Sequence, residues 1–212
     1  MRIDDKNSAV LTSGRGVTAE DGTTKARIER SALVLFVARG VDGVSVKEIA
    51  GLAGITDAAI YRHFASKAEL AEGLMLEIHE RLTGLVRDVA ARDLPFRGKI
   101  TALVSEYCAA ADDDWQLFAY HLLHLHHFPN LFTPGSGKVK RHDSPVTACT
   151  VMLERAVEDG DITPGNIELL ASMVLGIVLQ AASAKAYLRL QGPLSIYAAE
   201  FDKAVWAVLR HR

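Results

Sequence analysis

Residues 46–70 read VKEIAGLAGITDAAIYRHFASKAEL, and the end signals of three helices fall within this stretch. Ser45 and Glu48 fit the S-x-x-E capping box, in which a helix start satisfies its own free amides, and Gly54 ends that helix. Thr56 can cap a short helix that ends near Phe64. Ser66 then opens a long helix with a second capping box. The stretch therefore predicts three closely connected helices with a very short one in the middle.

The short helix has an unusual surface. On a wheel of 100° per residue, Ile60 and Phe64 share the side that can be buried. The opposite face and its flanks are small or polar: Ala58, Ala59, Tyr61, Arg62 and His63. Small residues allow close approach to a DNA major groove, and Arg62 has the geometry to bind guanine. Tyr61 and His63 are placed to contact phosphates. The alternative is a surface helix without a binding role.

Two lysines stand where a helix disfavours a positive charge. Lys47 and Lys67 lie in the first turns of their helices, and a cation there opposes the helix dipole. A helix N-terminus combined with a lysine makes a phosphate-binding site, to which the amides beside Ser45 and Ser66 can contribute. Residues 23–70 hold seven Lys and Arg against five Asp and Glu, whereas the whole chain has a net charge of -2. This modest local excess predicts salt-dependent DNA binding by two copies.

The segment 46–70 resembles the DNA-binding segment of the TetR family of transcriptional regulators, and the likeness extends over about residues 24–75. The Gly-Ile-Thr turn, the Ile-Tyr-x-x-Phe pattern and the Ser-Lys-x-x-Leu pattern carry it. The resemblance implies a helix-turn-helix dimer that binds palindromic operators and usually represses. By position it places DNA contacts at Ser45, Lys47, Thr56, Ala58, Ala59, Tyr61, His63 and Lys67; Arg62 is added from the wheel.

Asp57 has two interpretations. In some members of that family the residue at this position reads a base. The wheel instead places Asp57 at the first helical position, where the dipole stabilises an acid, and this second interpretation is favoured.

Helical periodicity continues through the rest of the chain. Five further helices are expected at about residues 96–112, 114–128, 144–159, 165–190 and 194–210, separated by Asp-, Pro- and Gly-rich breaks. No alternating strand pattern occurs. We therefore predict an all-α fold of about nine helices. Its domains are a flexible tail (1–22), a helix-turn-helix domain (23–70) and an effector-binding and dimerisation domain (71–212), linked by the long helix that starts at Ser66.

Composition narrows the class of protein further. The 212 residues include two cysteines, too few for a disulfide framework or a zinc ribbon, so reduced thiols in a cytoplasmic protein are expected. No signal peptide follows Arg2, and polar residues interrupt the apolar stretch 169–188, so no membrane partner is expected. The segment PGSGKV (134–139) lacks the first glycine of a phosphate-binding loop, and HERLT (79–83) lacks the second histidine of a zinc protease helix. We expect no enzyme and no cofactor.

The last two helices are predicted to form the dimer. Residues 165–190 are apolar almost all round, and their small side chains allow close packing in a four-helix bundle. The predicted interface residues are Gly176, Ala181, Ala184, Ile196, Ala199 and Val208. The alternative is that both helices are core of a monomer.

The segment WQLFAYHLLHLHHF (115–128) is rich in histidine. His121, His124 and His127 follow a stripe that could bind a metal, but no carboxylate or cysteine within the segment completes a ligand set. We expect instead a mostly apolar effector pocket with a few polar groups. Its predicted lining is Trp115, Phe118, His121, His124, Met152 and Met173.

Together these features predict a homodimeric repressor released from double-stranded DNA by a small apolar or amphipathic ligand. Two alternatives remain open. One is a DNA-organising protein of the same fold without an effector. The other is a metal sensor that uses the His121, His124 and His127 helix.

Overall fold

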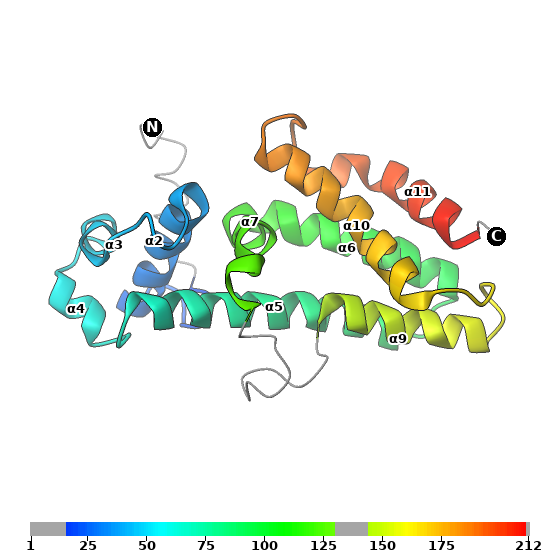
Figure 1. Cartoon of the computed structure of the whole chain (residues 1–212), viewed down its shortest axis with the longest axis horizontal. Helices are drawn as coiled ribbons and strands as arrows, with labels where there is room; N and C mark the ends of the chain where they lie inside the picture. Colours follow the sequence, from blue (N-terminus) through cyan, green and yellow to red (C-terminus); the bar gives the residue numbers. More distant parts are fainter. Residues whose placement is uncertain (1–15, 130–143, 211–212) are drawn as a thin grey trace.

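The computed structural model describes residues 16–129 and 144–210, and within them it is helical without strands, which confirms the all-α prediction. These residues form nine α-helices and two short 3₁₀ helices (Figure 1). The α-helices are α2 (Thr24–Arg39), α3 (Val46–Ala53), α4 (Asp57–Tyr61), α5 (Lys67–Ala91), α6 (Phe96–Asp113), α7 (Trp115–His124), α9 (Pro145–Glu158), α10 (Ile167–Ala186) and α11 (Ala198–Arg210); the 3₁₀ helices are η1 (Leu125–His127) and η2 (Leu194–Tyr197).

Helices α2, α3 and α4 gather at one end of the molecule (Figure 1). Each starts at a residue whose side chain accepts a hydrogen bond from a first-turn amide: Thr23, Ser45 and Thr56. Gly54 ends α3 with φ 67°, a left-handed conformation that suits glycine because it lacks a Cβ. The sharp turn at Gly54 brings α4 back against α3.

Helix α5 runs along most of the molecule and belongs to both of its halves (Figure 1). Its buried side chains recur every three or four residues, as expected for a helix packed along one stripe. They include Leu70, Leu74, Ile78, Leu82, Val86 and Val89. The buried apolar residues form one continuous core from Val17 to Leu209, to which α5 contributes along most of its length.

The remaining helices pack over the other end of α5. Figure 1 shows α9 beside α5, α6 above it and α11 on the side farthest from α5, with α10 crossing diagonally from the α11 side to α9. Helix α7 lies between α2 and this bundle, so it contacts both the end that carries α2, α3 and α4 and the larger helical bundle.

The observed helix ends differ from the predicted ones at four places, one of them the end of α10 at Ala186 rather than at about residue 190. The short middle helix stops at Tyr61 rather than near Phe64. The segment 114–128 is α-helical only to His124 and then tightens into η1, and the segment 194–210 begins as η2 before α11. Most of the predicted loop 129–143 lies outside the described residues.

Residues 16–22 do not form the flexible tail that the sequence predicted. The buried carboxylate of Glu29 on α2 accepts hydrogen bonds from the amides of Val17 (2.6 Å) and Thr18 (2.9 Å), and Arg81 on α5 donates to the Val17 carbonyl. A carboxylate inside a core is stable only when such donors surround it. The prediction is therefore wrong for residues 16–22, and residues 1–15 lie outside the described part.

Candidate nucleic-acid interface

The segment from Ala58 to His63 presents a polar surface at the end of the molecule. Ala58, Tyr61, Arg62 and His63 are exposed, and Tyr61 keeps 56% of its surface accessible. Neither the Arg62 guanidinium nor the His63 ring has a hydrogen-bond or ion-pair partner among the described residues. An exposed phenol, guanidinium and imidazole beside a small alanine can contact both bases and phosphates.

Ala59 does not belong to this surface. Its side chain was predicted to face outward, but only 5% of its surface is exposed. The wheel treated residues 57–64 as one regular helix, whereas α4 ends at Tyr61. In this short helix Ala59 and Ile60 both face the protein, so the methyl group of Ala59 cannot reach a base unless α4 rotates. Asp57 occupies the first position of α4, as favoured.

At the start of α3, Lys47 is free to contact a ligand, whereas the hydrogen-bond donors of Ser45 are engaged within the protein. The amide and hydroxyl of Ser45 donate to Glu48 at 2.8 and 2.7 Å, and Arg39 pairs with the same carboxylate at 2.7 Å. The hydrogen bonds from Ser45 are the main reason why the pKa of Glu48 falls to about 2. Both Ser45 donors are therefore engaged in the capping box. Lys47 is exposed next to this helix start, as is Thr56 at the start of α4.

The side chain of Lys67 is hydrogen-bonded within the protein. Its ammonium group donates to the carbonyl oxygens of Val41 and Val44, each at 2.7 Å. These two carbonyls lie in the turn between α2 and α3, so Lys67 holds that turn against the start of α5. Beside it, Ser66 caps α5, while the Glu69 carboxylate accepts from the amide of Ala65 instead of that of Ser66. The sequence predicted Lys67 as a phosphate anchor and did not anticipate this bracing role.

A partly buried ion pair joins this region to the larger bundle. Arg30 of α2 lies 2.8 Å from Asp114, which also caps α7 by accepting from the amide of Leu117. Six residues further along each helix, Phe36 of α2 stacks with Tyr120 of α7 at a centroid distance of 5.9 Å. The sequence did not predict these contacts between α2 and α7, because the residues that form them are far apart in the chain and the hydrophobic pattern of neither helix indicates them.

The predicted effector residues do not converge on one place. Phe118 borders a pocket of about 370 Å³ beside Arg30 and Asp114, whereas Met152 borders one of about 260 Å³ beside Lys99 and Arg155. Trp115 stacks on Phe118, with centroids 6.4 Å apart. Met173 is 42% exposed on α10, so its assignment to an interior pocket is wrong. It shares an outer stripe with Gly176, three residues along.

The histidines of α7 are buried inside the bundle. His121 lies 3.0 Å from His79 of α5, measured between ring nitrogens, and His124 is buried beside Tyr120. Within residues 16–129 and 144–210, no three His, Cys, Asp or Glu side chains are grouped so that they could hold a metal ion. The metal-sensor alternative therefore has no ligand set in the described part of the chain.

The predicted dimer residues lie on the outside of α10, η2 and α11. Ile196 is 60% exposed, Ala199 is exposed, and Gly176, Ala181, Ala184 and Val208 are partly exposed. Helix α10 is long and apolar enough to cross a membrane, with a mean hydropathy of 1.8, yet only 28% of that window is buried. The exposed Leu169 and Met173 extend the apolar surface. An exposed apolar surface of this kind marks a site where another molecule associates.

Sequence comparison identifies the end of the molecule that carries α3 and α4. Residues 28–74 match the family model described as bacterial regulatory proteins, tetR family. The HTH-type transcriptional regulator TtgR of Pseudomonas putida is 39% identical over 79 residues, which cover 37% of this chain and 38% of that protein. The nucleoid occlusion factor SlmA of Vibrio vulnificus is 26% identical over 153 residues, which cover 71% of this chain and 77% of SlmA.

Solved structures share the fold over most of the chain. The fatty acid degradation regulator FadR from Bacillus halodurans superposes with a TM-score of 0.72 at 19% identity, covering 92% of this chain and all of that one. FadR from Bacillus subtilis in complex with stearoyl-CoA superposes with a TM-score of 0.68 at 16% identity, covering 86% and 96%.

Residues 28–74 therefore form a helix-turn-helix of the kind found in the TetR family of transcriptional regulators, and the chain as a whole shares the fold of solved structures described as TetR-family regulators. The relatives named above are regulators or DNA-associated factors rather than enzymes, in agreement with the prediction that this chain is not an enzyme.

Proposed function

We propose that this protein is a cytoplasmic repressor that binds a palindromic DNA operator as a homodimer. The observation that carries the proposal is the exposed, unpartnered surface of Tyr61, Arg62 and His63, flanked by Lys47 at the start of α3. This surface lies within the segment that matches the family model. A helix-turn-helix places such residues in the major groove, and two-fold symmetry of the protein is mirrored in the operator.

Selection of bound duplexes from a random DNA pool tests the proposal. We expect enrichment of an inverted repeat whose half-sites are centred about one helical turn apart, or a multiple of it. The selected duplex is then titrated at several salt concentrations, and affinity should fall steeply as salt rises. Enrichment of no sequence, or of a single half-site bound by one copy, would contradict an operator-binding dimer.

The apolar outer surface of α10 supports the dimer. Helix α10 leaves most of its apolar window accessible, and a second copy would bury it. One DNA-binding unit contacts few phosphates, and two linked units raise the effective concentration of the second, so dimerisation also provides affinity.

We propose further that a small apolar or amphipathic ligand releases the DNA by entering the bundle formed by α5, α6, α7, α9 and α10. The buried histidines of α7 and the oxygen of Gln116, which lacks a hydrogen-bond partner, would supply polar contacts in an apolar setting. FadR from Bacillus subtilis, which shares the fold, was solved with stearoyl-CoA. A panel of fatty acids, acyl-CoA thioesters and aromatic compounds should contain a compound that both raises the melting temperature and lowers operator affinity.

A DNA-organising role without a ligand is the second candidate. It is favoured by the match to SlmA, which extends through 71% of this chain and beyond the helix-turn-helix. Under this alternative no compound of the panel alters operator affinity, and the selected sequence occurs at many sites spread over the genome.

A further inference from the structure

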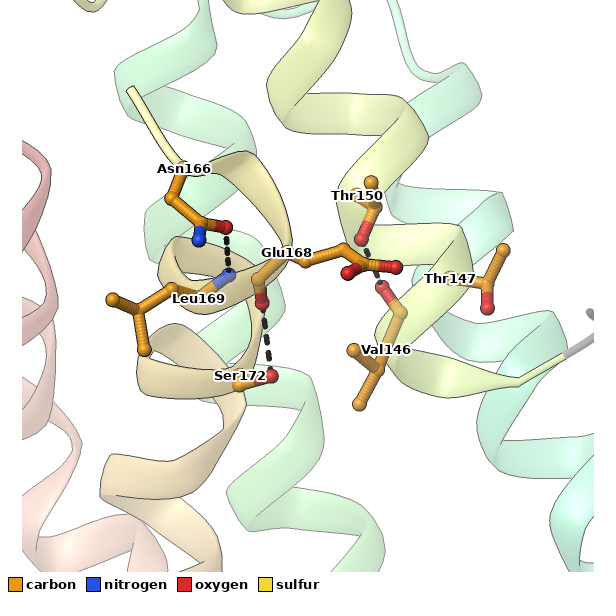
Figure 2. Close-up of a pocket in the computed structure, with 7 residues that line it drawn as sticks. All are labelled: Val146, Thr147, Thr150, Asn166, Glu168, Leu169 and Ser172. Atoms are coloured by element: carbon orange, nitrogen blue, oxygen red, sulfur yellow. Dashed lines mark hydrogen bonds between the residues drawn. The ribbon is translucent and has the colours of Figure 1, made fainter.

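A pocket lies between α9 and the first turn of α10, away from the DNA-binding end (Figure 1, Figure 2). Its volume is about 530 Å³, within the range of small-molecule sites. Seven residues line it: Val146, Thr147, Thr150, Asn166, Glu168, Leu169 and Ser172. Figure 2 shows the Glu168 side chain extending from α10 toward Thr150 of α9.

The hydroxyl groups of this pocket are oriented by the helices that carry them. Thr150 donates its proton to the carbonyl of Val146 at 3.0 Å, and Ser172 donates to the carbonyl of Glu168 at 2.9 Å. A hydroxyl has one proton and two lone pairs. Because the protons are engaged with the backbone, Thr150 and Ser172 offer oxygen lone pairs to anything inside the pocket.

Glu168 brings a negative charge to the same place. Its carboxylate has no ion-pair or hydrogen-bond partner among the described residues, and the lining contains no Lys, Arg or His. A helix N-terminus usually attracts anions, but here Glu168 itself occupies the first turn of α10. Asn166 uses its Oδ1 atom to cap the amide of Leu169 at 3.0 Å. The pocket therefore favours a cation with several N–H donors and disfavours an anion.

We propose that this pocket is a ligand site for a small alkylammonium compound. The ammonium group donates to the Glu168 carboxylate and to the hydroxyl oxygen of Thr150, toward which Glu168 extends (Figure 2). The alkyl chain packs on Val146 and Leu169, the apolar part of the lining. This site is separate from the interior effector region and does not depend on the proposed regulatory function.

Titration of the full-length protein with n-butylamine hydrochloride tests the proposal, with methyl resonances of Val146 and Leu169 as reporters. n-Butanol, of equal chain length, and sodium chloride serve as ligand controls. We expect saturable shifts with butylammonium and none with either control. Glu168→Gln, which keeps the side-chain shape, should weaken binding at least about tenfold, because it removes a charge-assisted hydrogen bond. Thr150→Val should weaken binding less, and Glu200→Gln on exposed α11 should leave it unchanged.

Three results would overturn the proposal. The first is equal shifts with n-butanol, and the second is unaltered binding by Glu168→Gln. The third is a wild-type protein that does not bind butylammonium while Glu168→Gln changes the sedimentation of the dimer. That third result would assign the carboxylate to contact with a second copy. A failure of DNA binding would leave all three readouts interpretable, since none involves DNA.

Discussion

Lys47 and Lys67 occupy similar positions in the sequence and different environments in the molecule. Each follows a capping serine in the first turn of a helix, and the sequence assigned both to phosphates. Lys47 extends from the surface, whereas the ammonium of Lys67 is bound by two backbone carbonyls. The distinction depends on where the turn between α2 and α3 lies in space, which local sequence does not encode.

Lys67→Met should lower the free energy of unfolding by about 1.5–3 kcal/mol, since it leaves the carbonyls of Val41 and Val44 without a charged donor. Lys47→Met should leave that free energy within about 0.5 kcal/mol of wild type. Urea unfolding followed by circular dichroism measures both. If Lys67→Met were as stable as wild type and bound DNA more weakly, the phosphate role predicted from the sequence would be the correct one.

Arg62 and Lys47 should differ in how they contribute to DNA binding. Arg62→Ala should cost about 1–3 kcal/mol of operator affinity and relax sequence preference, because in the proposed complex the guanidinium binds a base edge. Lys47→Ala should weaken binding to all sequences and reduce the salt slope by about one per site. Fluorescence anisotropy with the operator and a scrambled duplex at several salt concentrations measures both effects. Loss of sequence preference in Lys47→Ala, with Arg62→Ala changing the salt slope alone, would reverse these roles.

At the scale of the elements, α7 connects the two halves of the molecule. It contacts α2 through Asp114 and Tyr120, and it contacts α5 through Tyr120, whose hydroxyl donates to the carbonyl of Ala71 at 3.0 Å, and through His121. Both contacts with α5 are buried, so they fix how α7 lies against that helix. Any shift of α7 is therefore passed to α2 and α5 together.

The pairing of His121 with His79 should make the folded state sensitive to acid. Burial, reinforced by the nearby His79, lowers the pKa of His121 from 6.5 to about 3. Between these values the unfolded chain binds a proton at His121 that the folded chain does not, so the free energy of unfolding falls as pH decreases below about 6.5. The loss is at most about 1.4 kcal/mol per pH unit.

Urea unfolding at pH 7, 6 and 5 measures this dependence, and His121→Gln should make it shallower than in wild type. The matched control is His63→Gln, which removes an exposed imidazole that has no partner among the described residues and should leave the wild-type slope unchanged. An unaltered slope in His121→Gln would show that other groups cause the acid sensitivity.

The predictability of these elements follows from how local their signals are. Capping residues and periodicity located α2, α3, α5, α6 and α9 to within a few residues. This was possible because the residues that start a helix and those that form its buried stripe are close together in the sequence. The exposed Tyr61, Arg62 and His63 were also visible on a wheel. The sequence did not predict the burial of Ala59, the backbone contacts of Lys67 or the exposure of Met173. The surroundings of these three side chains are formed by residues distant in the sequence. The same holds for Glu29 of α2, whose carboxylate accepts hydrogen bonds from residues 17–19.

At the scale of the whole molecule, the apolar side of α10 is the surface that most needs a partner. Gly176 lies there, and a Cβ added to it meets no atom within 4 Å. Gly176→Glu is therefore compatible with the folded monomer but would bury a charge in a dimer, at a cost of several kcal/mol. We expect sedimentation to show monomers that have lost operator binding. The control Gly84→Glu, at another helical glycine with free space around it, should remain dimeric. A wild-type monomer at micromolar concentration would contradict the interface.

In such a dimer the two recognition helices must lie about 34–36 Å apart to enter successive major grooves. A ligand that moves α7 would change this spacing through α2 and α5, and a preference of a few kcal/mol for the displaced state is enough to release DNA. The bond from Tyr120 to Ala71 is one of the links by which α7 moves α5. Removal of this hydrogen bond should therefore reduce the ligand-induced loss of operator affinity more than it reduces operator affinity in the absence of ligand.

Tyr120→Phe keeps the ring beside Phe36 and removes only this hydrogen bond. We expect operator affinity without ligand to stay close to wild type, while the ligand-induced loss of affinity becomes smaller by about 2- to 30-fold, equivalent to 0.5–2 kcal/mol of coupling. Operator titrations with and without a compound from the ligand panel give both numbers. Tyr197→Phe removes a comparable bond to the Gln191 carbonyl at the far side of the bundle and should leave the response intact. An equal response in Tyr120→Phe and wild type would mean that the signal reaches the DNA-binding end through α2, by way of Arg30 and Asp114, without help from this contact with α5.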